Sequence, residues 1–155
     1  MWKILTFRLL VGGIVTGYVP YSILSSHPGP APTLLSAPTV TGVFLIAVGT
    51  YVYLRCVWDF AFGGQGDAPT ILVARGTYKF VRNPMYASLV LILAGESLLF
   101  ESWRLLGYAA VVWLGIHLLV MLYEERILAK KFGTSYEQYC QEVPRWIPRV
   151  HRLAS

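Results

Sequence analysis

Along the chain, four long apolar stretches are separated by shorter segments that contain most of the polar residues. A helix needs roughly 17 to 25 mainly apolar residues to cross about 30 Å of hydrocarbon. Three of the stretches meet this requirement, and the third in chain order is short. The pattern predicts an all-α, multi-pass integral membrane protein with about four transmembrane helices, at residues 4–24, 40–60, 85–100 and 105–123.

The third and fourth stretches are separated only by Glu101, Ser102, Trp103 and Arg104. We therefore expect them to form one tight helical hairpin. Antiparallel pairing about this turn would place His117 near Tyr86 and Glu124 near the Val81–Arg82 level. Both ends of the hairpin would then meet at one membrane face.

The distribution of Lys and Arg predicts the orientation, because cytoplasmic loops carry an excess of positive charge. The loop at 25–39 has none, whereas the segment before the hairpin and the C-terminal tail are basic. Both termini are therefore expected in the cytoplasm. We expect one membrane domain over 1–155, with two N-terminal spans (1–60), a cytoplasmic loop with Arg75, Lys79 and Arg82 (61–84), the hairpin (85–123) and a cytoplasmic tail with Arg126, Lys130, Lys131, Arg145, Arg149 and Arg152 (124–155).

The first apolar stretch has features of a cleavable signal peptide, since Lys3 precedes it and a Pro-rich segment follows it. It also carries Arg8, is long, and lacks a small-x-small cleavage pattern. We expect it to be retained as a span.

Composition agrees with a bilayer environment. Hydrophobic residues make up 55% of the 155 residues and charged residues only 14%, against about 25% charged in soluble domains. The net charge of +5 favours contact with anionic membrane lipids, and no basic stripe typical of nucleic-acid binding is present. Cys56 and Cys140 lack CxxC or His/Cys ligand spacing, so neither a disulfide nor a metal site is expected.

Glycines and one pair of charged residues in the predicted spans suggest specific local packing. Glycines in the first two spans, Gly12-Gly13 and Gly42 to Gly49, would allow close helix packing. Arg55 and Asp59 are one helical turn apart, which favours an intrahelical ion pair.

The segment GTYKFVRNPMY at 76–86 lies at the mouth of the hairpin. Asn83 is a favoured N-cap residue and Pro84 a favoured first helical residue. A helix N-terminus with Arg82 beside it is suited to a carboxylate or a phosphate. The alternative is that Arg82 only extends to lipid headgroups.

The tail is predicted to hold short helical segments. The helix after Tyr123 should end at Gly133. The capping-box pattern that starts at Ser135 predicts a short cytoplasmic C-terminal helix, which Pro144 should stop.

Three blocks in this half of the chain carry a family resemblance. GTYKFVRNPMYASL, YEERILAKKFG and YEQYCQEVPRWIP resemble motifs of the isoprenylcysteine carboxyl methyltransferase and phospholipid methyltransferase superfamily of integral membrane enzymes. The resemblance spans 76–148. It implies S-adenosylmethionine as cofactor, bound at the cytoplasmic face, and a lipophilic acceptor that enters from the bilayer.

The resemblance also implies roles for particular residues. Glu124, Glu125 and Arg145 are the candidate catalytic residues, and Glu124 also belongs to the cofactor set. A carboxylate or thiolate acceptor would need no base, whereas an amine or hydroxyl would use Glu124 or Glu125. The expected cofactor-binding residues are Tyr78, Arg82, Asn83, Pro84, Tyr86 and Glu124, and the hairpin geometry adds His117, for which simple packing is the alternative.

Asn83 departs from the family, which usually has histidine there. Asparagine can cap a helix but cannot titrate near neutrality. Two other functions stay open: an NADPH-dependent membrane reductase related to sterol reductases, and a non-catalytic membrane subunit. The sequence does not identify the acceptor or the oligomeric state.

Overall fold

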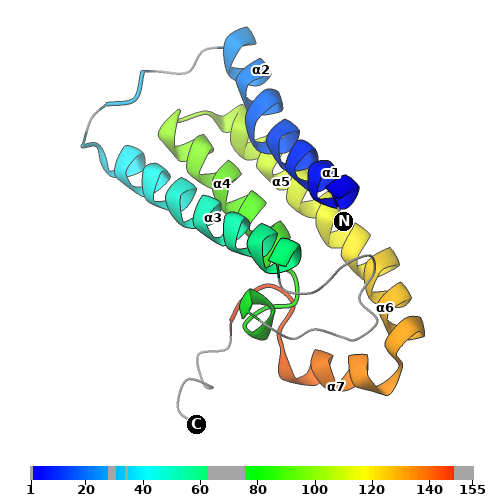
Figure 1. Cartoon of the computed structure of the whole chain (residues 1–155). Coiled ribbons are helices and arrows are strands. Elements are labelled where there is room, and N and C mark those ends of the chain that lie inside the picture. The colour runs from blue at the N-terminus through cyan, green and yellow to red at the C-terminus, as the bar shows by residue number, and fades with distance from the viewer. Residues whose placement is uncertain (1, 28–30, 34, 63–75, 149–155) are drawn as a thin grey trace.

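The computed structural model describes residues 2–27, 31–33, 35–62 and 76–148. All regular structure in these residues is helical (Figure 1). The elements in chain order are α1 (Trp2–Gly13), η1 (Ile14–Tyr18), α2 (Val19–Ser26), α3 (Ala37–Phe62), η2 (Gly76–Lys79), α4 (Pro84–Leu99), α5 (Trp103–Leu119), η3 (Val120–Glu124), α6 (Glu125–Phe132) and α7 (Thr134–Glu142).

Within the described residues, three continuous helical rods are long and apolar enough to cross a membrane: Leu9–Ser26, Ala37–Asp59 and Trp103–Phe132. The helix α4 has 16 residues, which corresponds to about 24 Å at the usual rise per residue. It is therefore shorter than the hydrocarbon thickness of about 30 Å. The predicted all-helical membrane protein is confirmed at this level.

Two of the rods contain a π-helical turn that the sequence analysis did not predict. The first is η1, which joins α1 to α2, and the second is η3, which joins α5 to α6. The hydroxyl of Tyr108 on α5 donates a hydrogen bond to the carbonyl of Val15 in η1 at 3.1 Å. This bond ties the first rod to the last.

The closest helix pair is α3 and α4, which lie side by side in Figure 1. A Cβ atom added to Gly95 would lie 2.6 Å from the carbonyl oxygen of Gly42, and one added to Gly42 would lie 2.7 Å from the carbonyl oxygen of Gly95. Gly49 similarly faces the backbone of Ser88. The backbones therefore touch, and the expected close packing is confirmed at Gly42 and Gly49. Of the other pair, Gly12 lies against the side chain of Tyr53, whereas nothing lies within 4 Å of a Cβ at Gly13.

This contact predicts that Gly95→Leu will destabilise the protein strongly. Overpacking typically costs about 1–3 kcal/mol, and a clash with backbone atoms is expected to reach the upper end. Gly107→Leu is the matched control, since nothing lies within 4 Å of a Cβ at Gly107. Thermal unfolding in detergent measures the difference, and equal midpoints for the two variants would contradict the packing argument.

The hairpin turn connects α4 to α5 as predicted. Phe100 follows the end of α4, and Ser102 caps α5 by accepting a hydrogen bond from the backbone N–H of Leu105 at 3.4 Å. Glu101, between them, has a φ of +43°.

In the tail, both helices end where predicted, but the predicted side-chain cap of the second helix is not found. Gly133, with φ of +52°, ends α6 as predicted. The predicted start of α7 at Ser135 is wrong, because α7 begins at Thr134 with Gly133 in the N-cap position and no side-chain cap. The backbone carbonyl of Gly133 accepts from the N–H groups of Tyr136 and Glu137 instead. The helix ends at Glu142, before Pro144, as predicted.

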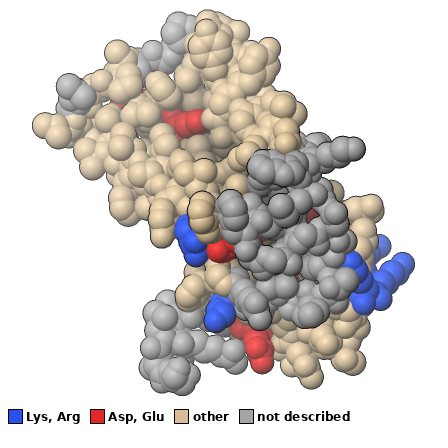
Figure 2. All heavy atoms as spheres, viewed as in Figure 1, with Lys and Arg blue, Asp and Glu red and all other residues tan. Residues whose placement is uncertain are grey.

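Some predictions concern residues outside the described part. Most of the loop 61–84 falls there, including Arg75, and so do Arg149 and Arg152. Among the described residues, Lys and Arg side chains gather in the lower half of the face in Figure 2, while the upper half is almost free of them. The exposed cations of α6 are Arg126, Lys130 and Lys131.

Candidate functional site

The turn η2 is held against the end of α3. Gly76 opens it with a φ of +59°, and a Cβ there would collide with the carboxylate of Asp59. Asp59 pairs with Arg55 at 3.2 Å, so the predicted intrahelical ion pair is confirmed. Cys56 and Thr77 are also in hydrogen-bond contact, at 3.3 Å. These contacts fix the position of η2, which carries Tyr78.

The start of α4 differs in one respect from the prediction. Pro84 is the first helical residue and Asn83 occupies the N-cap position, as expected, but the Asn83 side chain makes no capping bond. Its Nδ2 instead donates to the carbonyl of Arg145 at 3.5 Å, and the backbone N–H of Arg82 donates to the carbonyl of Pro144 at 2.9 Å. The Asn83 amide is thus engaged with the tail and not with the N–H groups of the first turn of α4. The prediction that the Asn83 side chain caps α4 is therefore wrong.

Arg82 lies at the centre of the site, and its side chain is only 14% exposed. One terminal nitrogen donates to the Sγ of Cys140 at 2.7 Å and lies 3.2 Å from Oε1 of Glu125. The Nε atom is buried and has no hydrogen-bond partner among the described residues. An unpaired buried donor of this kind is costly.

Glu125 joins Arg82 to the tail. Its two carboxylate oxygens accept from Nε and one terminal nitrogen of Arg145, both at 2.8 Å. This bidentate geometry is the strong form of an arginine–carboxylate pair, and the hydrogen bond to Glu125 raises the pKa of Arg145 above its ordinary value. Two guanidinium groups share one carboxylate, so the cluster keeps a net positive charge.

Glu124 faces a different partner from its neighbour Glu125. The hydroxyl of Tyr86 on α4 donates to Oε1 of Glu124 at 2.5 Å. Glu124 ends the π-helical turn η3, and Glu125 begins α6. The predicted proximity of this end of the hairpin to the Val81–Arg82 level is supported by the contact between Glu125 and Arg82. The hydrogen-bond partner of Glu124 itself is Tyr86.

His117 lies in an aromatic stack. It packs against Trp113 with a centroid distance of 5.3 Å and an interplanar angle of 15°, and it lies 6.0 Å from the ring of Trp146. The indole N–H of Trp146 donates to Nδ1 of His117 at 3.2 Å. The tail therefore also contacts the long apolar helix α5.

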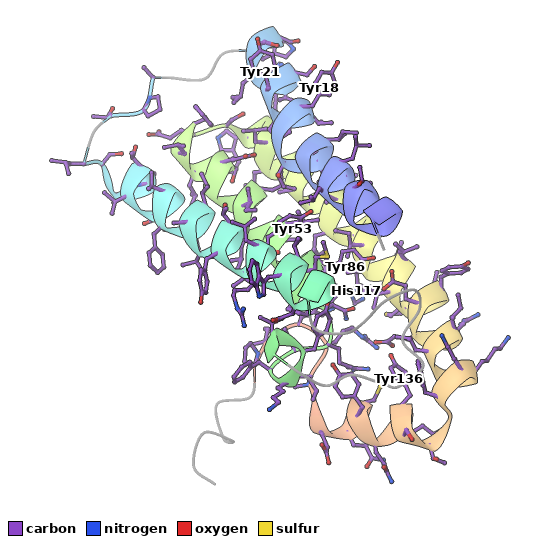
Figure 3. The ribbon with its side chains drawn as sticks, in the orientation of Figure 1. Tyr18, Tyr21, Tyr53, Tyr86, His117 and Tyr136 are labelled. Atoms are coloured by element: carbon purple, nitrogen blue, oxygen red, sulfur yellow. The ribbon has the colours of Figure 1, made fainter. Side chains whose placement is uncertain are left out.

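The helix α7 closes the site from the side opposite α4. Figure 3 shows Tyr136 of α7 facing the region where Tyr86 and His117 lie, far from Tyr18 and Tyr21. The hydroxyl of Tyr139 donates to the backbone carbonyl of Tyr78 at 2.8 Å. Burial raises the pKa of Tyr139 to about 12, and burial also raises that of Tyr136. Both phenols therefore stay neutral near physiological pH.

The sequence-predicted residues thus fall into two adjoining groups. Arg82, Asn83, Glu125 and Arg145 are linked directly, and Tyr86 with Glu124 forms a second pair. Pro84 starts α4 beside them, and the backbone carbonyl of Tyr78 accepts a hydrogen bond from Tyr139. Sequence reasoning expected Tyr136 and Tyr139 to pack the tail helix against the hairpin, but it gave Cys140 and Trp146 no part in the site, although both belong to the block YEQYCQEVPRWIP. Among the described residues no group of three or more His, Cys, Asp or Glu side chains could hold a metal ion.

Several known proteins resemble the chain. The nickel-cobalt-cadmium resistance protein NccN of Alcaligenes xylosoxydans xylosoxydans is 24% identical over 149 residues, covering 96% of this chain and 68% of NccN. Protein-S-isoprenylcysteine O-methyltransferase B of Arabidopsis thaliana is 32% identical over 81 residues, covering 52% of this chain and 41% of that protein. The corresponding O-methyltransferase of Schizosaccharomyces pombe is 33% identical over 81 residues, covering 52% and 34%.

The chain spans less than half the length of these two methyltransferases. It also matches the phospholipid methyltransferase family over residues 37–135, which is more than half of the chain. That range includes α3, the motif at the start of α4, and both glutamates of the candidate site. By this match, the chain belongs to the phospholipid methyltransferase family.

Proposed function

We propose that this protein transfers a methyl group from S-adenosylmethionine to a lipophilic acceptor at the cytoplasmic face of a membrane. The family match and the two similar isoprenylcysteine O-methyltransferases support methyl transfer. S-adenosylmethionine supplies a methyl group on a positively charged sulfonium, together with an amino-acid carboxylate. The described residues must therefore offer a site for an anion and a site for a cation.

The observation that carries the proposal is the unpaired Nε of Arg82. This buried donor lies in a cluster of two arginines and one glutamate, at the N-terminus of α4. A carboxylate is the ligand that would satisfy both the donor and the excess positive charge, and the start of a helix favours it further. We assign Arg82 to the amino-acid carboxylate, with Asn83 and Pro84 shaping the helix start.

The cation would be bound by the second pair. Glu124 brings a carboxylate, and Tyr86, whose hydroxyl donates to that carboxylate, brings an aromatic ring; both groups attract a sulfonium. Tyr78 is the further aromatic candidate, while the other cofactor candidate, His117, contacts Trp113 and Trp146. Arg145 is assigned to holding Glu125. For an amine or hydroxyl acceptor, Glu124 or Glu125 would act as the base.

The proposal includes four membrane crossings with both termini in the cytoplasm. A crossing by α4 is supported by its place in the chain. This helix runs from the end of the molecule that carries the site to the turn before α5. The orientation is supported by the exposed cations of α6, since positive residues favour the cytoplasmic side. An acceptor with its tail in lipid would then meet the cofactor from the bilayer side.

Calorimetric titration of the detergent-solubilised protein with S-adenosylmethionine, and in parallel with NADPH, tests the proposal. We expect saturable binding of S-adenosylmethionine and none of NADPH. Transfer of labelled methyl groups to a prenylated cysteine analogue or to a phospholipid amine then identifies the acceptor class.

The other outcomes each exclude the proposal. Binding of NADPH alone would favour the reductase, and binding of neither would favour a non-catalytic subunit. A heat-unfolded sample provides the control for partition of either molecule into detergent micelles.

A further inference from the structure

The segment 143–148, which we call the tail strap, follows α7 and has no regular secondary structure. Two of its backbone carbonyls, those of Pro144 and Arg145, accept hydrogen bonds from Arg82 and Asn83. Its Arg145 side chain holds Glu125. The tail strap therefore forms one wall of the candidate site, held by these hydrogen bonds and by the buried side chain of Val143.

Trp146 provides the contact between the tail strap and the membrane-spanning helix α5. Its indole N–H donates to Nδ1 of His117, so this nitrogen of His117 is the unprotonated one. His117 in turn stacks on Trp113 one helical turn earlier. In an apolar span an unpaired imidazole nitrogen would be costly, and the indole N–H removes that cost only when the tail strap is in place.

We propose that Trp146 is a positioning residue for the candidate site. It acts through His117 to hold the tail strap, and thereby Arg145, against Glu125 and Arg82. This inference rests on the proposed function for its effect on cofactor affinity, but the contact it concerns does not depend on any ligand.

The position of Trp146 in the chain explains why it has this effect. It is adjacent to Arg145, so moving the indole moves the backbone that carries both the guanidinium and the carbonyl bonded to Asn83. The helix α7 is held separately, through the buried Tyr136 and the bond from Tyr139 to Tyr78. Loss of the indole contact should therefore release the tail strap and leave α7 in place.

Two single variants and their combination test the bond. Trp146→Phe keeps an aromatic ring but loses the N–H, and His117→Leu removes the acceptor. We expect each to weaken S-adenosylmethionine binding about tenfold, which corresponds to the loss of one hydrogen bond. The double variant should also lose only about tenfold, because both changes remove the same bond. His117→Gln, which retains an acceptor, should bind S-adenosylmethionine more tightly than His117→Leu does.

Trp103→Phe is the matched control, because Trp103 is 84% exposed and lies at the opposite end of α5. Its affinity should be unchanged. Multiplicative losses in the double variant, or no rescue by His117→Gln, would overturn the positioning role even if every variant folds with an unchanged melting temperature.

Hydrogen–deuterium exchange of the ligand-free protein gives a second readout that is independent of the proposed function. The amide of Arg82 is bonded to Pro144, so we expect faster exchange at Arg82 in Trp146→Phe and His117→Leu, with the amides of α7 unchanged. Equal exchange at Arg82 in all variants would refute the inference. If the unmodified protein fails to bind S-adenosylmethionine, the proposed function fails, and the exchange result alone decides the role of Trp146.

Discussion

Replacing Arg82 with alanine is expected to weaken the binding of S-adenosylmethionine about 100-fold, since removal of one partner from a desolvated charge pair costs about 2–5 kcal/mol. The guanidinium is largely buried, its Nε is the unpaired donor of the site, and it also contacts Glu125 and Cys140. The protein should remain folded, because Arg145 still holds both oxygens of Glu125. Calorimetry and the melting temperature in detergent measure the two quantities.

Two further variants sharpen this prediction. Arg55→Ala removes another arginine with a carboxylate partner, but one at the end of α3 with a side chain that is 44% exposed; it should leave cofactor affinity unchanged. Arg82→Lys keeps the charge but not the fork of donors, and we expect an intermediate loss. If Arg82→Ala binds S-adenosylmethionine as well as Arg55→Ala does, the assignment of Arg82 to the carboxylate is wrong.

The sequence predicted the helices well because their signals are local. Long apolar runs, Pro84 at the start of α4 and Gly133 at the end of α6 each depend on a few neighbouring residues. The predicted link between the motif at 76–86 and the pair Glu124–Glu125 also appears in the structure, through Tyr86 and Arg82.

Side-chain partners were predicted less well because they depend on distant segments. Asn83 has the sequence context of a helix cap, yet the carbonyl of Arg145, 62 residues later, takes its amide. Ser135 has a capping-box context, but the preceding glycine provides the helix start. In both cases tertiary structure or a neighbouring backbone conformation overrode a local preference.

The π-helical turns left no signal in the pattern of apolar residues. In η3 this mattered most, because a π-turn changes which residues of the following turn face α4. Glu124 therefore meets Tyr86, while Glu125 meets Arg82 and Arg145. Trp146, which reads as an interfacial aromatic in the sequence, was similarly found only through its bond to His117.

Replacing Glu124 with glutamine should weaken the binding of the cofactor, which has a positively charged sulfur, more than the binding of its demethylated product, which has a neutral sulfur. Glutamine can still accept the hydrogen bond from Tyr86 but carries no charge. Attraction between unit charges about 4 Å apart ranges from ~1 kcal/mol in water to ~4 kcal/mol near a protein surface. We therefore expect the affinity for the sulfonium of S-adenosylmethionine to fall about tenfold or more, while the affinity for the neutral thioether S-adenosylhomocysteine stays within about twofold.

Tyr86→Phe is the matched control for this experiment, because it removes the hydrogen bond and keeps the carboxylate. Its losses should be similar for the two ligands. Competition calorimetry on the three proteins gives both affinities for each. Equal losses for both ligands in Glu124→Gln would mean that Glu124 shapes the site without acting on the sulfonium charge, and the cation site would then have to be sought at other residues. A selective loss would locate the transferable methyl group on the Glu124 side of the site, away from the carboxylate held by Arg82, and so fix the direction from which a lipophilic acceptor must approach.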